Sequence, residues 1–205
     1  MRKHVALVSV GILLGSCGGS GGGPPSPTPV VATLFSSQEG SVEAVGNNFV
    51  GGLVCGDNNA NPSGGGPYRA FLTFSLSLPS GAAVTSAVLH LRQANVAGNP
   101  YTDLGTVLVE HVDYGASAPF KTNFAQAALD ATGGTLSANS TLEDKALDVT
   151  ASVQADLAAA RTRSQFRLRF TPLDGNADGQ DDLATFENAT NDQGTTGVPR
   201  LVVTC

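Results

Sequence analysis

The sequence predicts an all-β protein, an antiparallel β-sandwich or barrel with one short helix inserted before the last strands. From Leu34 onward, short runs of alternating apolar and polar residues are separated by clusters of Gly, Asn, Asp and Pro, which is typical of such folds. The composition agrees, because 41% of the 205 residues are hydrophobic and only 14% are charged. That is too apolar for a disordered chain. A body of about 170 residues is long enough to bury a core.

The first sixteen residues are predicted to be a lipoprotein signal peptide. A short basic start at residues 2–4 is followed by an apolar run over residues 5–14, which is too short to span a bilayer as a mature helix. The run ends in Leu14-Gly15-Ser16-Cys17, which resembles the lipobox of bacterial lipoproteins. The resemblance implies that Cys17 is lipid-modified and becomes the first mature residue. An ordinary signal peptide with an incidental cysteine is the alternative.

Residues 17–29 are predicted to be a lipid anchor and tether, and residues 30–205 the folded domain. The tether contains GGSGGG, which is flexible, and PPSPTP, which is stiff and extended. Several acyl chains on Cys17 would anchor the protein to the membrane. Because Gly18 and not Asp follows the cysteine, the likeness to lipoproteins implies the outer membrane of a two-membrane bacterium. The expected location is the bacterial cell envelope, at the outer membrane or the cell surface.

The charge and the aromatic content limit the partners. The net charge is −6, and removal of residues 1–16, with Arg2 and Lys3, makes it −8. Neutralising phosphates needs clustered Lys and Arg, so we expect no nucleic-acid binding. The chain has no Trp, the residue whose large, rigid surface suits sugar-binding platforms.

Cys55 and Cys205 are predicted to form a disulfide once Cys17 is lipidated. An exported protein with two remaining cysteines most simply pairs them. Such a bridge would close a loop of about 150 residues and contribute about 4–5 kcal/mol in the chain-entropy model. Two buried thiols or a metal site are the alternatives, although two cysteines without histidines at matching spacing make a poor zinc site.

Eight strands are predicted from alternation and turn residues. They cover residues 41–45, 52–55, 69–75, 84–93, 106–112, 165–171, 184–187 and 200–204. In the sixth, Phe166, Leu168 and Phe170 alternate with Arg167 and Arg169, which predicts one buried face and one exposed face.

One helix is predicted over ASVQADLAAAR at residues 151–161. Val149, Val153 and Leu157 recur every four residues, as on the buried face of a helix. Asp148 or Thr150 would cap its start. A second, shorter helix is predicted over residues 124–129.

A series of short motifs resembles one known family. The motifs are RAFLTF at 69–74, LPSGA at 78–82, VTSAVL at 84–89, LDVT at 147–150, VQ at 153–154 and PRLVV at 199–203. In this order they resemble the DNRLRE-type domain, which is akin to carbohydrate-binding module family 96. The resemblance spans about residues 35–205 and implies a jelly-roll-like β-sandwich on exported bacterial proteins, some of which bind polysaccharide. This chain lacks the Trp residues common in that family.

Residues 174–182, DGNADGQDD, resemble a calcium-binding loop. Asp174, Asn176 and Asp178 fall at alternate positions and Gly179 follows, as in the first half of a D-x-N-x-D-G loop. A solvated hairpin loop is the alternative, because Asp, Asn and Gly are common turn formers. The predicted ligands of a structural calcium ion are Asp174, Asn176, Asp178, the carbonyl of Gln180, and Asp182.

A possible glycan-binding face is expected from the arginines. Arg167 and Arg169 on the exposed face of one strand, with Arg92 and Tyr68 as further contacts, would suit the carboxylates of an acidic polysaccharide. A solvated face balanced by the protein's own acids is the alternative. His90 and His111 are expected to be ordinary strand residues.

The sequence shows no nucleophile elbow, P-loop or HExxH motif, so no enzyme is predicted. The expected function is that of a lipid-anchored envelope β-sandwich with a non-catalytic binding or structural role. The alternatives are a carbohydrate-binding module for acidic polysaccharide, a protein that docks other envelope proteins, and a polysaccharide-active enzyme.

Overall fold

The computed structural model describes residues 29–45, 49–50, 52–59, 65–78, 82–119, 121–130, 133–176, 178–189 and 197–205. The predicted signal peptide, the tether up to residue 28 and the lipidation of Cys17 lie outside these residues. The first described residue, Pro29, begins a strand.

Strands dominate the described chain. In chain order the elements are β1 (Pro29–Ala32), a short 3-10 helix (Ser36–Gln38), β2 (Gly40–Glu43), β3 (Phe49–Val50), β4 (Leu53–Asn58), β5 (Pro67–Ser75), β6 (Ser86–Ala97), α1 (Pro100–Asp103), β7 (Gly105–Val112), α2 (Lys121–Phe124), β8 (Gly134–Ser137), β9 (Asp144–Asp148), α3 (Thr150–Ala158), β10 (Arg163–Pro172), β11 (Asp181–Phe186) and β12 (Arg200–Thr204).

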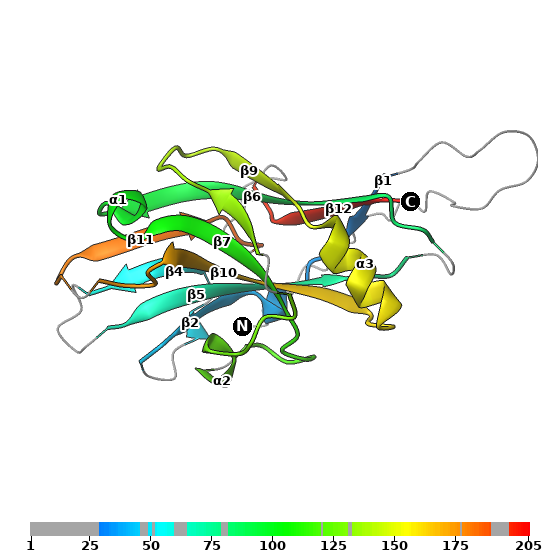
Figure 1. Ribbon diagram of the computed structural model, residues 1–205, viewed down its shortest axis with the longest axis horizontal. Helices are drawn as coiled ribbons and strands as arrows, with labels where there is room; N and C mark the ends of the chain where they lie inside the picture. The colour runs from blue at the N-terminus through cyan, green and yellow to red at the C-terminus, as the bar shows by residue number, and fades with distance from the viewer. Residues whose placement is uncertain are drawn as a thin grey trace, which may run out of the picture.

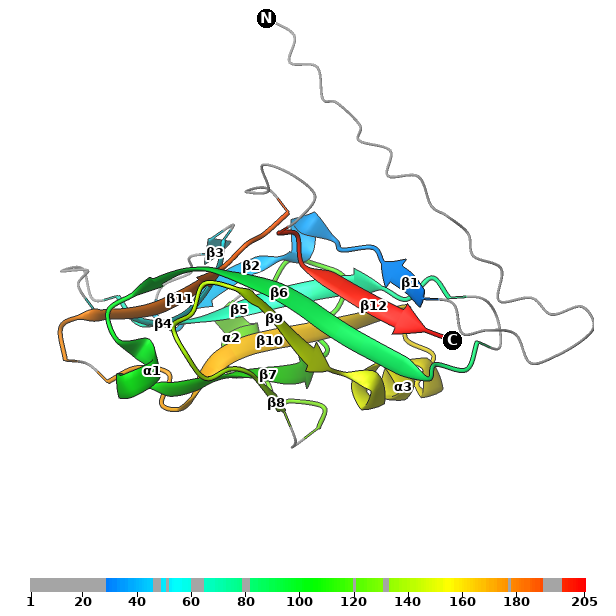
Figure 2. The same ribbon diagram turned by 90° about the horizontal axis from the view of Figure 1, so that it is seen from above.

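The strands form two layers that share β6 (Figure 1, Figure 2). One layer has the order β1-β12-β6-β9, and the other has the order β11-β4-β5-β10-β7-β8, with β2 beside β5 and β3 beside β2. Residues 86–90 of β6 pair with β12, and residues 93–97 pair with β11. All described pairings are antiparallel. The predicted all-β antiparallel sandwich is confirmed.

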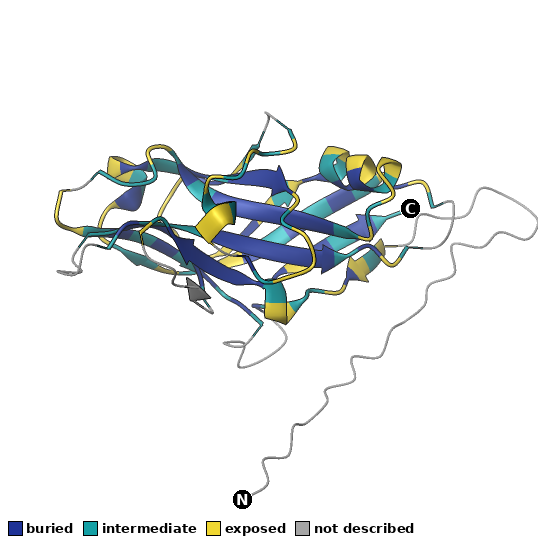
Figure 3. Ribbon diagram, turned by 90° about the horizontal axis from the view of Figure 1, so that it is seen from below, coloured by how far each residue is buried: buried dark blue, intermediate teal, exposed yellow. Residues whose placement is uncertain are grey.

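The core lies between the two layers. Phe166, Leu168 and Phe170 of β10 are fully buried, and so are Leu89 of β6 and Leu201 of β12. The alternation of β10 thus identified its inner face correctly. Burying each such side chain contributes about 1.5–3 kcal/mol, and this makes the core the main source of stability. Figure 3 shows buried residues along the strands, whereas exposed residues concentrate in the helices and loops.

The helix α3 is held at both ends. At its start, the Asp148 carboxylate accepts the N–H of Thr150 at 2.9 Å, while the Thr150 hydroxyl accepts the N–H of Ala87 at 2.8 Å. At its end, Ala160 takes a left-handed conformation with φ +54°, so the helix stops before the predicted residue 161.

The second predicted helix is misplaced. The structure has α2 at Lys121–Phe124 and no regular helix over 124–129 in the described chain. Arg167 donates hydrogen bonds to the carbonyls of Asn123, Phe124 and Gln126. A helix running through these residues would use the same carbonyls for its own backbone bonds.

The predicted disulfide is wrong, because the fold keeps the two cysteines apart. Cys55 lies beside Ala184, which pairs with Val96 of β6, whereas Cys205 follows the β12 residue that pairs with Ser86. Ten residues of β6 separate these positions, a distance of about 33 Å, and a disulfide needs Cα atoms within about 7 Å. Neither cysteine is disulfide-bonded, and burial raises the pKa of the Cys55 thiol.

Candidate functional site

Three connections meet at one end of the sandwich: the turn after β6, the helix α1, and the loop from β10 to β11 (Figure 1). The turn depends on Gly98, which has φ +66° and whose added Cβ would lie 2.0 Å from the carbonyl oxygen of Asp181. This close approach lets the N–H of Asn99 donate to Oδ1 of Asp182 at 2.7 Å. The end of β6 and the start of β11 are therefore joined directly.

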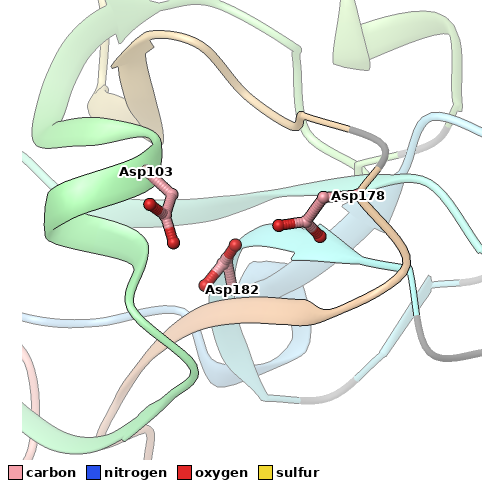
Figure 4. Close-up of side chains that lie close together, drawn as sticks. All are labelled: Asp103, Asp178 and Asp182. Carbon is pink, nitrogen blue, oxygen red and sulfur yellow. The ribbon is translucent and has the colours of Figure 1, made fainter.

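Three carboxylates converge at this end. Asp103 ends α1, Asp178 lies in the β10–β11 loop, and Asp182 lies in β11. One oxygen from each lies within 4.8 Å of the other two. Figure 4 shows the three side chains pointing toward one another from separate elements. We call these three residues the carboxylate cluster.

The cluster has the donor chemistry of a hard cation site. Asp182 is 1% exposed, whereas Asp103 and Asp178 are exposed, so one ligand is fixed in the protein and two face solvent. In the described part of the chain, no Lys, Arg or His forms an ion pair with any of the three. Ca²⁺ takes six to eight oxygen ligands from carboxylates, carbonyls and water. The cluster would supply three of them, with solvent free to supply others.

Hydrogen bonds within the loop shape the cluster. The Asn176 side-chain amide donates to Oδ2 of Asp178 at 3.1 Å and to Oδ2 of Asp182 at 3.4 Å. The N–H of Gln180 donates to Oδ1 of Asp178 at 2.8 Å. Asn176 therefore stands beside the cluster as a donor, although its predicted role was that of an oxygen ligand.

The structure places Asp174 away from the cluster. Its Oδ2 lies 2.5 Å from Nη2 of Arg69 on β5, so this carboxylate already has a cationic partner. Two of the five predicted ligands, Asp178 and Asp182, therefore lie in the carboxylate cluster. Asp174 lies outside it. The residue that sequence reasoning missed is Asp103, which lies 75 positions before Asp178 in the chain. Only the folding of α1 onto this end of the sandwich brings it into place, and no local motif marks it.

The predicted arginine face is not a free surface, and this prediction is corrected. Arg167 is 3% exposed, because the segment between β7 and β8 folds over it. Its guanidinium donates to the carbonyls of Asn123, Phe124 and Gln126 at 3.2, 3.0 and 2.7 Å. The neighbouring Arg69 donates to the same Phe124 carbonyl and stacks 4.3 Å from the Phe124 ring centre.

Glu110 of β7 pairs with both predicted arginines. Its two oxygens accept from Nε of Arg167 at 2.7 Å and from Nε of Arg169 at 2.9 Å. Burial alone would raise the pKa of the Glu110 carboxyl, but the hydrogen bonds and charges of Arg169 and Arg167 outweigh burial and lower this pKa. Arg167 therefore holds a surface segment in place, and Glu110 offsets part of the charge of the two arginines.

The other two predicted glycan contacts lie elsewhere. Arg92 is on β6, 43% exposed, and forms a 3.6 Å pair with Asp144 of β9 on the outer side of the other layer. Tyr68 is on β5, where its hydroxyl accepts from the Asn58 side chain at 3.4 Å. The four residues do not converge on one surface, so the expected glycan-binding face is not assembled.

Comparisons with known proteins give no further identification. No protein-family model matches the chain, and no curated protein matches its sequence. The resemblance to the DNRLRE-type domain therefore stays a prediction. No helix in the described part of the chain is long and apolar enough to cross a membrane.

Proposed function

We propose that the protein is a lipid-anchored β-sandwich of the bacterial envelope with a non-catalytic binding or structural role, and that the carboxylate cluster holds a structural calcium ion. The observation that carries the proposal is the position of the cluster relative to the ends of the domain. β1 and the C-terminus lie at one extremity of the domain, and α1, which ends in Asp103 of the cluster, lies at the other (Figure 2).

The strand β6 connects these two extremities. At its start, Ser86 lies beside Thr204, which in turn lies beside Pro29, the first residue of β1. At its end, Ala97 leads into the turn that contacts Asp182. Eleven steps along a strand measure about 36 Å. A lipid on Cys17 would therefore hold one extremity near the membrane and leave the carboxylate cluster at the far end.

A calcium ion at the cluster would add a direct link between separate parts of the chain. Asp103 belongs to α1, and Asp178 belongs to the β10–β11 loop. Shared coordination would fix both to Asp182, which is already buried and bonded to the backbone of Asn99. The ion would also neutralise three like charges held close together.

Thermal unfolding of the full chain in excess calcium and in chelator tests the ion. At a calcium concentration of about 100 times Kd, binding adds about 2.7 kcal/mol, which for a domain of this size corresponds to a rise in Tm of about 5–10 °C. Asp178→Asn should abolish most of this rise. The matched control is Asp144→Asn, which removes the same charge at a 60% exposed position on another part of the sandwich. Equal Tm values in calcium and chelator would overturn the calcium assignment.

Membrane fractionation tests the anchor independently of calcium. We expect the wild-type chain to sediment with membranes and to require detergent for release, because acyl chains insert into the bilayer. Cys17→Ala should move the protein to the soluble fraction. Retention of Cys17→Ala in the membrane fraction would contradict lipid anchoring at this residue and would leave the calcium result unaffected.

The alternative of an acidic-polysaccharide module receives no support from the arginines. Arg167 and Arg169 already bind Glu110, and Arg167 also binds backbone carbonyls. Arg167 is 3% exposed, so a glycan could reach its charge only after displacing these contacts.

A further inference from the structure

The outer face of the β1-β12-β6-β9 layer carries a row of three valines. Val31 pairs with Val202, and Val202 pairs with Val88, so the three side chains lie side by side on one face of the layer. Leu201 and Leu89, their neighbours along the strands, point to the other face and are fully buried in the core. Val31 is 59% exposed, the largest value among the exposed large hydrophobic residues of the described chain, and Val88 and Val202 are half-buried. We call these three residues the valine row.

The valine row lies at the extremity where the chain enters the fold. Val31 belongs to the edge strand β1, and Val88 is the third residue of β6. Figure 2 shows β1, the start of β6 and the C-terminus at this extremity. Pro29, the first residue of β1, follows Cys17 by twelve residues, which span at most about 43 Å. A lipid on Cys17, as in the function proposed above, would therefore keep the valine row within reach of the bilayer surface.

An exposed arginine adjoins the valine row. Arg200 precedes Val202 by two residues on β12, so the two side chains leave the same face. Arg200 is exposed and forms no ion pair with any of the described residues. The acidic side chains of this face, Asp144 and Asp148, belong to β9 at the opposite edge of the layer. A guanidinium beside apolar side chains suits the boundary between lipid phosphates and acyl chains.

The size of the valine row favours a bilayer over a protein partner. Three valines, two of them half-buried, expose far less surface than the about 800 Å² per partner that a stable protein interface buries. A bilayer contact can be much weaker, because an anchor on the same chain makes it intramolecular. The effective concentration across a short flexible linker is about millimolar. A contact too weak to recruit a free protein is therefore sufficient to orient an anchored one.

We propose that the valine row, with Arg200 beside it, contacts the anionic surface of the membrane that holds the lipid anchor. This inference rests on the lipid anchor of the proposed function and adds to it the face of the domain that meets the bilayer.

The test uses a single tryptophan as a fluorescent probe, because the chain has none. Val31→Trp places the probe in the valine row, and Ala155→Trp places it at an exposed position of α3, at the same extremity but outside the row (Figure 2). Each lipidated full chain is anchored in vesicles of phosphatidylethanolamine and phosphatidylglycerol, with or without brominated acyl chains. Bromine quenches only a tryptophan that approaches the acyl region. We expect at least twofold stronger quenching of Val31→Trp than of Ala155→Trp.

The outcomes separate the membrane contact from the anchor. Equal quenching of the two variants, or no quenching of either in vesicles that retain the protein, would overturn the contact and leave the anchor standing. Protein that does not sediment with the vesicles would refute the anchor and the contact together. Without vesicles, a blue shift of Val31→Trp emission that grows with protein concentration would assign the valine row to a second copy of the chain instead.

Two arginine substitutions in the Val31→Trp chain test the charge. Arg200→Gln should reduce the quenching in vesicles that contain phosphatidylglycerol. Arg92→Gln makes the same charge change on the same face, but its guanidinium already pairs with Asp144 at 3.6 Å, so it should have a smaller effect. If Arg92→Gln reduces the quenching as much as Arg200→Gln does, the assignment of Arg200 to the contact is wrong.

Discussion

Glu39 makes the stability of the fold depend on pH in an unusual direction. This residue precedes β2 and is 3% exposed. Its Oε1 accepts the N–H of Ala189 at 2.8 Å, whereas its Oε2 is buried with no hydrogen-bond partner among the described residues. Burial raises the pKa of the Glu39 carboxyl from 4.5 to about 7, and the hydrogen bond from Ala189 only partly opposes this effect.

The sign of the effect follows from the pKa in each state. Because the folded-state pKa of Glu39 is raised, the folded protein binds a proton more tightly than the unfolded chain does. The contribution of Glu39 to the stability of the folded protein is therefore fully present below pH 4.5 and is lost as the pH rises through about 7. At 1.36 kcal/mol for each pH unit between the two values, the loss is about 3 kcal/mol. Most carboxylates change stability in the opposite direction.

The perturbation is Glu39→Gln, which imitates the protonated carboxyl. Denaturant unfolding of wild type and variant at pH 4.5 and pH 8 gives the free energy of unfolding at each pH. Relative to the wild type, the free energy of unfolding of Glu39→Gln should be about 3 kcal/mol higher at pH 8 than at pH 4.5. Glu187→Gln, at a half-buried glutamate of the β11–β12 connection, serves as the control and should show no such gain. If the difference between wild type and Glu39→Gln is the same at both pH values, the reasoning about the buried carboxyl is refuted.

Three further outcomes are expected. Glu110→Gln leaves two arginines without their buried counter-charge and should cost about 3–5 kcal/mol in denaturant unfolding; an unchanged midpoint would show that solvent compensates them. Gly98→Ala brings a Cβ within 2.0 Å of a backbone oxygen and should lower Tm clearly more than Gly179→Ala, where φ is also positive but nothing lies within 4 Å. Under denaturing conditions without reductant, the thiols of Cys55 and Cys205 should both react with an alkylating reagent. If neither residue is alkylated, the two cysteines are joined by a disulfide and the structural result is wrong.

The strands that were found from the sequence are those with one apolar face in the core. The alternation of β10 identified Phe166 and Phe170 as buried, because the side chains of a strand alternate between its faces. The edge strand β9 was missed, since its sequence DKALD is mostly polar. Its Lys145 is 6% exposed because the ammonium binds Glu143 and Asn139, an arrangement that alternation does not reveal.

The outer faces of the strands and the candidate site depend on contacts distant in sequence. Alternation placed Arg167 correctly away from the core, yet it carried no information about the segment that covers this arginine. Two of the predicted calcium ligands, Asp178 and Asp182, lie in the carboxylate cluster, whereas Asp174 pairs with Arg69 on another strand. Local spacing predicts which oxygens are near one another along the chain. It does not predict competing partners from elsewhere.

The pairing of β1 also determines how the domain responds to mechanical load. β1 runs antiparallel to β12, with four residue pairs from Pro29↔Thr204 to Ala32↔Leu201. The next residues bind β5, through the N–H of Ser75 to the carbonyl of Thr33 at 2.7 Å. Because ladder hydrogen bonds lie across the strands, a pull on the chain before Pro29 acts along β1 and loads these bonds together in shear. The extremity where a membrane tether would enter is therefore built to resist tension, and the load passes into both layers of the sandwich.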